Sequence, residues 1–287
     1  MARGLDHAVH AVRDLDAAAD LYARLGFHVG PRNIHPWGTH NRIIQFPGFF
    51  LELLTVAQPD KLGADGFSTH FGAFNRDFLA RDEGLSMLIL ESEDVEHDVA
   101  AFRADGIAAS DVLNFERQGR LADGSEATLG FSLGFARDPT PARAGFAVCR
   151  QRQPDLFWSE ALQQHPNTAD GVASVIMVAD NPTDHHIFLS AFAGERELHA
   201  TSLGVSVATP RGDIQILDPA AFRSQFGIEA PDIGEGLRLA AVRFTVRNGE
   251  ALVAALEAGE VDFLSQMALT VVPAAQALGA TLVFSPA

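Results

Sequence analysis

A carboxylate stands in an apolar stretch of this sequence, in the segment FFLELL at residues 49–54. Side chains alternate between the two faces of a strand, so Glu52 would share its face with Phe50 and Leu54. Burying an unpaired charge costs several kcal/mol or raises the pKa of the carboxyl group. Glu52 therefore needs a cation, a proton or a hydrogen-bond donor, and the nature of that partner limits the chemistry available to the chain.

Arginine is one possible partner. Glu52 could form a structural ion pair with Arg42, or with Arg150 or Arg152 from a later strand. Cys149 lies beside these last two arginines, but a nucleophilic cysteine also needs an adjacent base and a lowered pKa.

The other histidines have plain structural interpretations. We expect His10 to face the helix layer, and His35 and His40 to lie exposed in a loop or at a strand edge. His185 and His186 are expected in an exposed helical turn.

Internal repetition shows which elements would position these residues. A predicted strand, an amphipathic helix and a glycine stop recur at residues 4–30, 84–110 and 171–197, with a shorter version at 237–263. Segments rich in Val, Phe, Leu and Thr follow each repeat and are typical of about three strands. The unit is a βαβββ module, present four times.

Modules of this kind cannot cover both faces of their own sheet, so we expect them to pair. The polar segment 154–171 separates the second and third modules and indicates a connection near Trp158 to Asn167. We predict an N-terminal module pair at residues 1–157 that carries the site and a C-terminal pair at residues 158–287.

Composition limits the partners. A net charge of -16 and a single lysine leave no basic stripe for nucleic acid to follow. The one cysteine excludes an internal disulfide. No signal peptide and no apolar run of about 18 residues is evident. We expect a cytoplasmic protein that binds neither nucleic acid nor a membrane, either monomeric or a homodimer.

The modules, the opening strand DHAVHAV and the closing strand FFLELL resemble the vicinal oxygen chelate superfamily, which includes glyoxalase I, extradiol dioxygenases and bleomycin-resistance proteins. The segments HPWGTHN and FAVCRQRQPDLFW resemble its glyoxalase-like domain proteins. This resemblance implies an α+β fold in which four βαβββ modules pair into two curved mixed-sheet cups. It also implies a divalent metal in a cup, held by the first and last strands of each module.

On this resemblance, His7 matches a first-strand ligand and Glu52 a last-strand ligand. Imidazole and carboxylate together suit Zn, Ni, Fe or Mn. The second module places Met87 where His7 stands and offers Gln151 as a weak ligand or Cys149 as a soft one. The C-terminal pair lacks histidines in these strands and is expected to be metal-free.

Two functions follow from this set, and a third is less favoured. The first is a metal-dependent lyase or isomerase acting on a small oxygen-bearing molecule, with Glu52 or a bound water moving the proton. The second is a metal-independent binding protein of the bleomycin-resistance type. An extradiol dioxygenase needs two histidines and a carboxylate, and Met87 argues against it. Residues expected to contact the small molecule are Thr39, Asn41, Arg150 and Gln151, although Thr39 and Asn41 could instead stabilise a turn.

Overall fold

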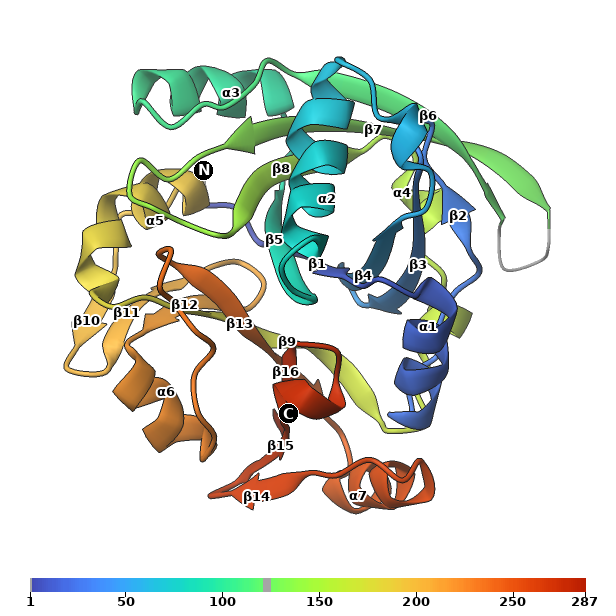
Figure 1. Cartoon of the computed structure of the whole chain (residues 1–287), viewed down its shortest axis with the longest axis vertical. Coiled ribbons are helices and arrows are strands. Elements are labelled where there is room, and N and C mark those ends of the chain that lie inside the picture. The colour runs from blue at the N-terminus through green and yellow to red at the C-terminus, as the bar shows by residue number, and fades with distance from the viewer. Residues whose placement is uncertain (1, 121–124) are drawn as a thin grey trace.

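The computed structural model describes residues 2–120 and 125–287 and contains two curved eight-stranded sheets (Figure 1). The first sheet comprises β1 (Leu5–Ala11), β2 (Asn33–Ile34), β3 (Thr39–Phe46), β4 (Phe49–Val56), β5 (Gly84–Glu91), β6 (Leu113–Arg120), β7 (Glu126–Ala136) and β8 (Gly145–Gln151). The second comprises β9 (Ala169–Val178), β10 (His199–Thr201), β11 (Gly204–Ala208), β12 (Asp213–Leu217), β13 (Arg238–Val246), β14 (Leu264–Gln266), β15 (Leu269–Val272) and β16 (Thr281–Pro286).

Helices follow the first strand of each module and also connect the modules. They are α1 (Leu15–Arg24), α2 (Phe74–Leu79), α3 (Val95–Ala104), α4 (Pro154–Phe157), α5 (His186–Ala193), α6 (Pro219–Phe226) and α7 (Gly249–Ala258). A π-helix, Ser68–Ala73, precedes α2, and short 3-10 turns span Pro59–Lys61, Glu160–Gln163, Pro182–His185 and Ala274–Gln276. The element order confirms four βαβββ modules and the predicted α+β fold.

Local sequence explains the repeated helix boundaries. The side chains of Asp14 and Asp94 accept hydrogen bonds from backbone N–H groups in the first turns of α1 and α3, which satisfies donors that have no partner within the helix. Gly26 and Gly194 follow α1 and α5 with φ of 81° and 67°. Glycine adopts this left-handed conformation without a steric penalty, so the helix ends there.

The two sheets have the same topology. The first runs β2-β3-β4-β1-β5-β8-β7-β6 and the second β10-β11-β12-β9-β13-β16-β15-β14. In each sheet the first strands of two modules pair antiparallel at the centre, and each also pairs parallel with the last strand of its own module. Two modules therefore form each cup, as predicted. The expected connection at residues 158–167 lies between β8 and β9.

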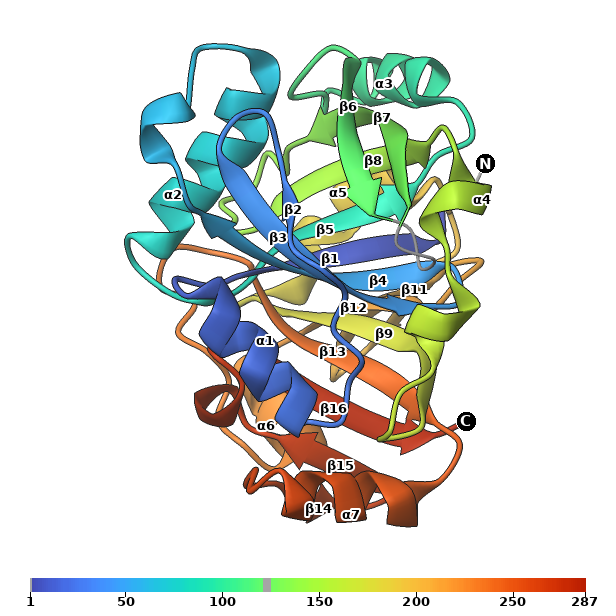
Figure 2. The ribbon, with the colours of Figure 1, turned by 90° about the vertical axis from the view of Figure 1, so that its right-hand side faces the viewer.

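The outer faces of both sheets and the helices on them share one apolar core. The ring of Phe27 lies 5.5 Å from Phe244 and 6.0 Å from Phe284, and Phe46 stacks on Phe244 at 5.0 Å. Figure 2 shows α1 beside the second sheet, and the Arg24 side chain donates a hydrogen bond to the carbonyl of Gly259. The halves therefore stabilise each other.

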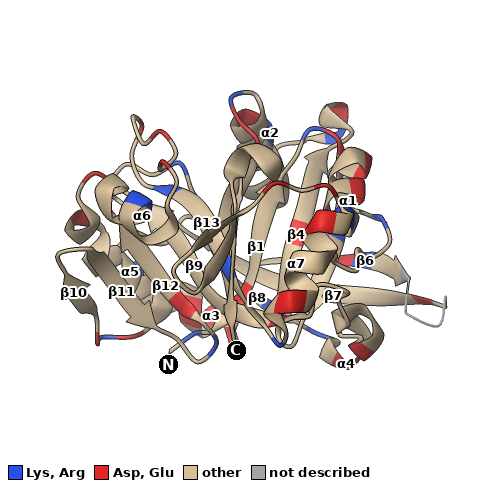
Figure 3. Cartoon of the chain, turned by 90° about the horizontal axis from the view of Figure 1, so that it is seen from below, with Lys and Arg blue, Asp and Glu red and all other residues tan. Residues whose placement is uncertain are grey.

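The inner faces of the two sheets differ. In the second sheet, α6 packs Phe222 and Phe226 against inner-face residues such as Ile176 and Val283. In the first sheet, the inner face carries a buried carboxylate, Glu52 on β4. Figure 3 shows many of the other acidic and basic residues on the helices and loops around the sheets. Within the described ranges, no helix is long and apolar enough to cross a membrane.

Removing the Phe244 ring from the shared core should destabilise both halves together. Both tryptophans pack on the first cup, Trp37 against Phe67 and Trp158 against Phe50 and Phe157, so their fluorescence reports unfolding there. We expect Phe244→Ala to lower the free energy of unfolding by about 3–5 kcal/mol in that fluorescence transition, while Ile187→Ala at an exposed site should change it little. An unchanged tryptophan transition in Phe244→Ala would show that the halves unfold independently.

His10 should make the fold sensitive to acid. Its ring contacts the Tyr22 hydroxyl on α1 at 2.8 Å, and its Nε2 lies 2.9 Å from the Leu278 carbonyl in the other half, which confirms that His10 faces the helix layer. Burial lowers the pKa of His10 to about 4. The unfolded chain therefore takes up this proton at a higher pH than the native protein, and stability falls as the pH drops from about 6.5 to about 4.

At 1.36 kcal/mol per pKa unit, this loss reaches about 3 kcal/mol. Between neutral pH and about pH 4, we expect the free energy of unfolding of wild type to fall by up to that amount more than the free energy of unfolding of His10→Gln. Urea unfolding at each pH measures both. Parallel pH dependences of the two proteins would contradict the assignment.

Candidate functional site

An aromatic cavity lies inside the first cup. Its apolar wall is made mainly of seven rings, those of Trp37, Phe50, Phe67, Phe71, Phe115, Phe131 and Phe157. Its polar lining comprises His7, His35, Asn41, Glu52 and Arg117. The space open to the centres of water-sized molecules is about 40 Å³, and one buried water needs about 10–15 Å³. This space is sufficient for a few waters or for part of a small molecule.

The π-helix and α2 cover this cavity from one side. Phe67 and Phe71 of this segment line the cavity. Asn75 on α2 is fully buried, donates to the Phe71 carbonyl at 2.8 Å, and accepts a hydrogen bond from Ser86 on β5. These contacts attach the cover to the central strand.

His7 and Glu52 lie side by side on the inner face, from adjacent parallel strands. Their closest atoms, Nε2 of His7 and Oε2 of Glu52, are 3.8 Å apart. The Asp6 carboxylate lies 2.5 Å from Nδ1 of His7, and the His7 ring stacks on Phe50 at 4.2 Å. Asp6 therefore orients the imidazole so that its other nitrogen faces Glu52.

Glu52 is a buried carboxylate whose pKa is raised. Desolvation is the main cause, while His7, the hydrogen bond from Asn41 and the charge of Arg117 act in the opposite direction. The side-chain amide of Asn41 donates to Oε1 of Glu52 at 2.5 Å. One carboxylate oxygen is thus held by Asn41 and the other faces His7, which suits a group that accepts and returns a proton.

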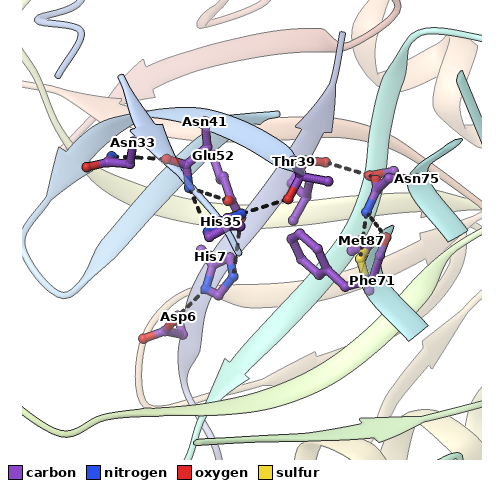
Figure 4. A network of polar contacts seen from close by, with 12 residues as sticks. Asp6, His7, Asn33, His35, Thr39, Asn41, Glu52, Phe71, Asn75 and Met87 are labelled. Atoms are coloured by element: carbon purple, nitrogen blue, oxygen red, sulfur yellow. Dashed lines mark hydrogen bonds and ion pairs between the residues drawn. The ribbon is translucent and has the colours of Figure 1, made fainter. Parts of the chain in front are cut away.

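Four further residues extend this cluster beyond Asn41. His35 places Nε2 3.5 Å from the Asn41 amide nitrogen and Nδ1 2.8 Å from the Thr39 hydroxyl. Asn33 donates to Oδ1 of Asn41 at 3.0 Å and accepts from the Arg117 guanidinium at 2.9 Å. Figure 4 shows Asn33, His35, Asn41, Glu52 and His7 pointing toward one another.

The structure brings some of the expected ligand-contacting residues to this cluster and leaves others outside. Asn41 lines the cavity, whereas Thr39 is buried behind it and reaches it through His35. Gln151 does not line the cavity but donates to Asp6 at 3.1 Å. Arg150 is exposed because side chains alternate along β8 and Cys149 takes the inner face.

None of the arginines suggested as ion-pair partners compensates Glu52. Arg42 pairs with Asp16 at 3.2 Å, Arg152 lies 3.7 Å from Glu116, and Arg150 is exposed. The prediction of a direct ion pair with one of them is wrong. Arg117, from another strand, is the arginine that lines the cavity.

The inner face of the second module offers few metal ligands at the corresponding positions. When the two modules are aligned on their helix starts, Asp14 and Asp94, Met87 is equivalent to His7 and Ile89 is equivalent to Val9. Val9 pairs with Glu52, and Ile89 pairs with Ala147, so Ala147 is the counterpart of Glu52. A thioether and a methyl group stand where two ligands would be needed, and across the described ranges no cluster of three or more His, Cys, Asp or Glu has metal-binding geometry. These residues do not fit the four-ligand metal site of the superfamily.

Cys149 is an inert thiol in this environment. It is buried, and desolvation raises its pKa well above the ordinary value, with the charges of Asp6 and Glu52 acting in the same direction. A reactive or metal-binding cysteine needs the opposite shift.

The sequence interpretation missed Asp6, His35 and Arg117 as members of the site. His35 was expected to be exposed but is 5% exposed, because its ring stacks on Trp37 and meets Phe115 edge-on. His40 and His185 are also buried, contrary to expectation, and His185 pairs with Asp138 at 2.7 Å. The alternation of Phe115, Arg117 and Gly119 in one strand was the available indication that Arg117 faces inward.

Known structures share this architecture. A hypothetical protein from Staphylococcus aureus aligns with a TM-score of 0.69 and 12% identity over 99% of this chain and 100% of its own. A mutant of 4-hydroxymandelate synthase from Streptomyces coelicolor aligns with a TM-score of 0.58 and 11% identity over 99% of this chain and 92% of its own. At such low identity these likenesses show the fold alone. A search among curated protein sequences found no match.

Paired βαβββ modules forming two cups place the chain in the vicinal oxygen chelate superfamily. More narrowly, the chain belongs to the glyoxalase-like domain family, which matches residues 5–192. That match covers the first two modules and the beginning of the third, and so includes the whole cavity.

The state of Cys149 can be tested directly, because it is the only cysteine in the chain. We expect a thiol reagent such as dithionitrobenzoate to leave the native protein unmodified and to react with one thiol per chain after unfolding in guanidinium. Full labelling of the native protein within minutes at mildly alkaline pH would contradict a buried thiol with a raised pKa.

Proposed function

We propose that this protein is an enzyme of the lyase or isomerase type that moves a proton on a small oxygen-bearing molecule bound in the first cup, with Glu52 as the proton acceptor. The observation that carries the proposal is the environment of Glu52. Its carboxylate is buried in an aromatic cavity, its pKa is raised, and one oxygen is held while the other faces His7.

The chemistry that suits this arrangement is proton transfer next to a carbonyl group. Glu52 takes the proton from carbon, and the electron pair of the C–H bond moves onto the carbonyl oxygen to form an enolate. The Arg117 guanidinium lines the same cavity and can donate hydrogen bonds to that oxygen. Return of the proton gives an isomer, whereas loss of a group from the neighbouring carbon gives a lyase product.

A divalent metal is not required by this proposal. His7 and Glu52 could contribute two ligands to Zn, Ni, Fe or Mn, but the second module presents Met87 and Ala147 in place of the other two. We therefore assign the proton transfer to the side chains alone. Metal analysis of protein purified without added metal or a histidine tag tests this part separately.

A second candidate is a binding protein without catalysis, of the bleomycin-resistance type. The aromatic wall favours it, because such surfaces bind apolar ligands through burial and stacking and need no reactive group. In that case the cluster around Glu52 would only orient the ligand.

Deuterium exchange at carbon separates the two candidates. A panel of small ketones, aldehydes and oxo acids is incubated with chelator-treated protein in D2O, and loss of α-proton signals is followed by NMR. We expect exchange of at least one compound with wild type and a rate about 10²–10⁴ lower with Glu52→Gln, the usual contribution of a general acid–base group.

The exposed carboxylate of Glu96 on α3 provides the matched control, and Glu96→Gln should exchange at the wild-type rate. Equal rates for wild type and Glu52→Gln would overturn the role of Glu52. Ligands that quench tryptophan fluorescence in the cavity without any exchange would favour the binding protein.

A further inference from the structure

Two buried charges of opposite sign face the same cavity without touching. Arg117 on β6 is 6% exposed and Glu52 on β4 is 3% exposed. Within residues 2–120 and 125–287, no carboxylate oxygen lies within 4.0 Å of the Arg117 guanidinium. Desolvation lowers the pKa of Arg117 to about 10, and Glu52 is the group whose charge opposes this shift. Arg117 in turn acts on Glu52 across the cavity, although the nearby His7 acts on Glu52 more strongly.

Two asparagines connect these charges in a fixed direction. Arginine has only donors, so Asn33 must accept from Arg117 through Oδ1. The amide nitrogen of Asn33 then donates to Oδ1 of Asn41, and the amide nitrogen of Asn41 donates to the Glu52 carboxylate. The cation and the anion determine both amide orientations, and neither amide can rotate by 180° without losing two hydrogen bonds.

We call the hydrogen-bonded series Arg117–Asn33–Asn41–Glu52 the relay. It also joins the two edges of the first sheet. β2 and β6 are the outermost strands of the order β2-β3-β4-β1-β5-β8-β7-β6, yet Arg117 on β6 reaches Asn33 on β2. The cup is therefore closed edge to edge by the contact that compensates Glu52. Arg117 further lies over the Phe131 ring, with its guanidinium carbon 5.6 Å from the ring centroid, which fixes its position inside the cavity.

The orientation of Asn41 is unfavourable for a metal. Its NH₂ group points at Glu52 Oε1 and lies 3.5 Å from Nε2 of His35. An amide nitrogen that donates hydrogen bonds supplies no lone pair to a cation, and here it occupies the space between a carboxylate and an imidazole that could otherwise act as ligands.

We infer that Arg117 is the built-in counter-cation of Glu52, and that the relay through Asn33 and Asn41 takes the role that a divalent metal has in the superfamily. Arg117 acts through the asparagines and is a positioning residue for Glu52. The inference concerns the site on which the proposed function rests, but it makes no use of catalysis.

Metal binding by Asn41→Asp tests the inference. This change replaces the NH₂ group with a carboxylate oxygen of similar size, breaks the relay, and places a third acidic or imidazole ligand beside Glu52 and His7. We expect wild type to bind neither Zn²⁺ nor Ni²⁺ in calorimetry and to show no change in Tm with either ion. Asn41→Asp should bind one ion per chain and gain Tm when the ion is added.

Asn114→Asp is the matched control, because Asn114 is exposed on β6 outside the cavity, and it should behave like wild type. Stoichiometric binding of either ion by wild type would overturn the inference. Failure of folded Asn41→Asp to bind either ion would do the same.

A second measurement does not depend on the folding of Asn41→Asp. The side-chain amide protons of Asn41 should give a strongly shifted NMR signal in wild type, because one of them is bonded to a carboxylate. We expect Arg117→Met to move this signal toward the ordinary range and Arg117→Lys to restore much of the shift, since lysine retains a charge and donors. An unchanged signal in Arg117→Met would show that Arg117 does not position Asn41. If the metal-binding and NMR results are as expected but no compound exchanges deuterium, the proposed function is contradicted and the inference about Arg117 is not.

Discussion

The cost of placing a carboxylate inside an apolar cup is the constraint on which the first half of this protein depends. Glu52 is only 3% exposed and has lost most of its hydration, so its charge has to be met largely by groups of the chain. Asn41 and His7 contact it directly or closely, and Arg117 acts on it from across the cavity. These three groups come from three different strands, β3, β1 and β6, and their meeting requires the sheet to curve until its edges touch.

The second half shows what the same fold becomes without such a carboxylate. Its sheet has the same strand order, but Phe222 and Phe226 of α6 fill the inner face. In the first half, the corresponding connection forms the π-helix and α2, which cover a cavity and leave space over the polar cluster. One half thus serves as a packed support, joined to the other through a common core around Phe244.

The partial loss of the metal-ligand set agrees with this division. The first module retains a histidine and a carboxylate on adjacent strands, while Met87 and Ala147 make the matching positions of the second module apolar. Such a cup can keep acid–base chemistry with its remaining polar groups, because a buried carboxylate beside an oriented imidazole is by itself able to exchange protons. The aromatic wall lowers the polarity around this pair and so strengthens its electrostatic interactions.

The sequence alone determined the parts of this protein that depend on local patterns. The modules followed from helix starts at Asp14 and Asp94 and from glycine stops, and the shared face of His7 and Glu52 followed from strand alternation, because these features are set by neighbours along the chain. The partner of Glu52 was decided only by tertiary structure. Arg117 lies 65 positions away along the chain, on the opposite edge of the sheet, and it reaches Asn33 because curvature closes the cup. No local pattern encodes that curvature, since it arises from the twist and packing of eight strands together.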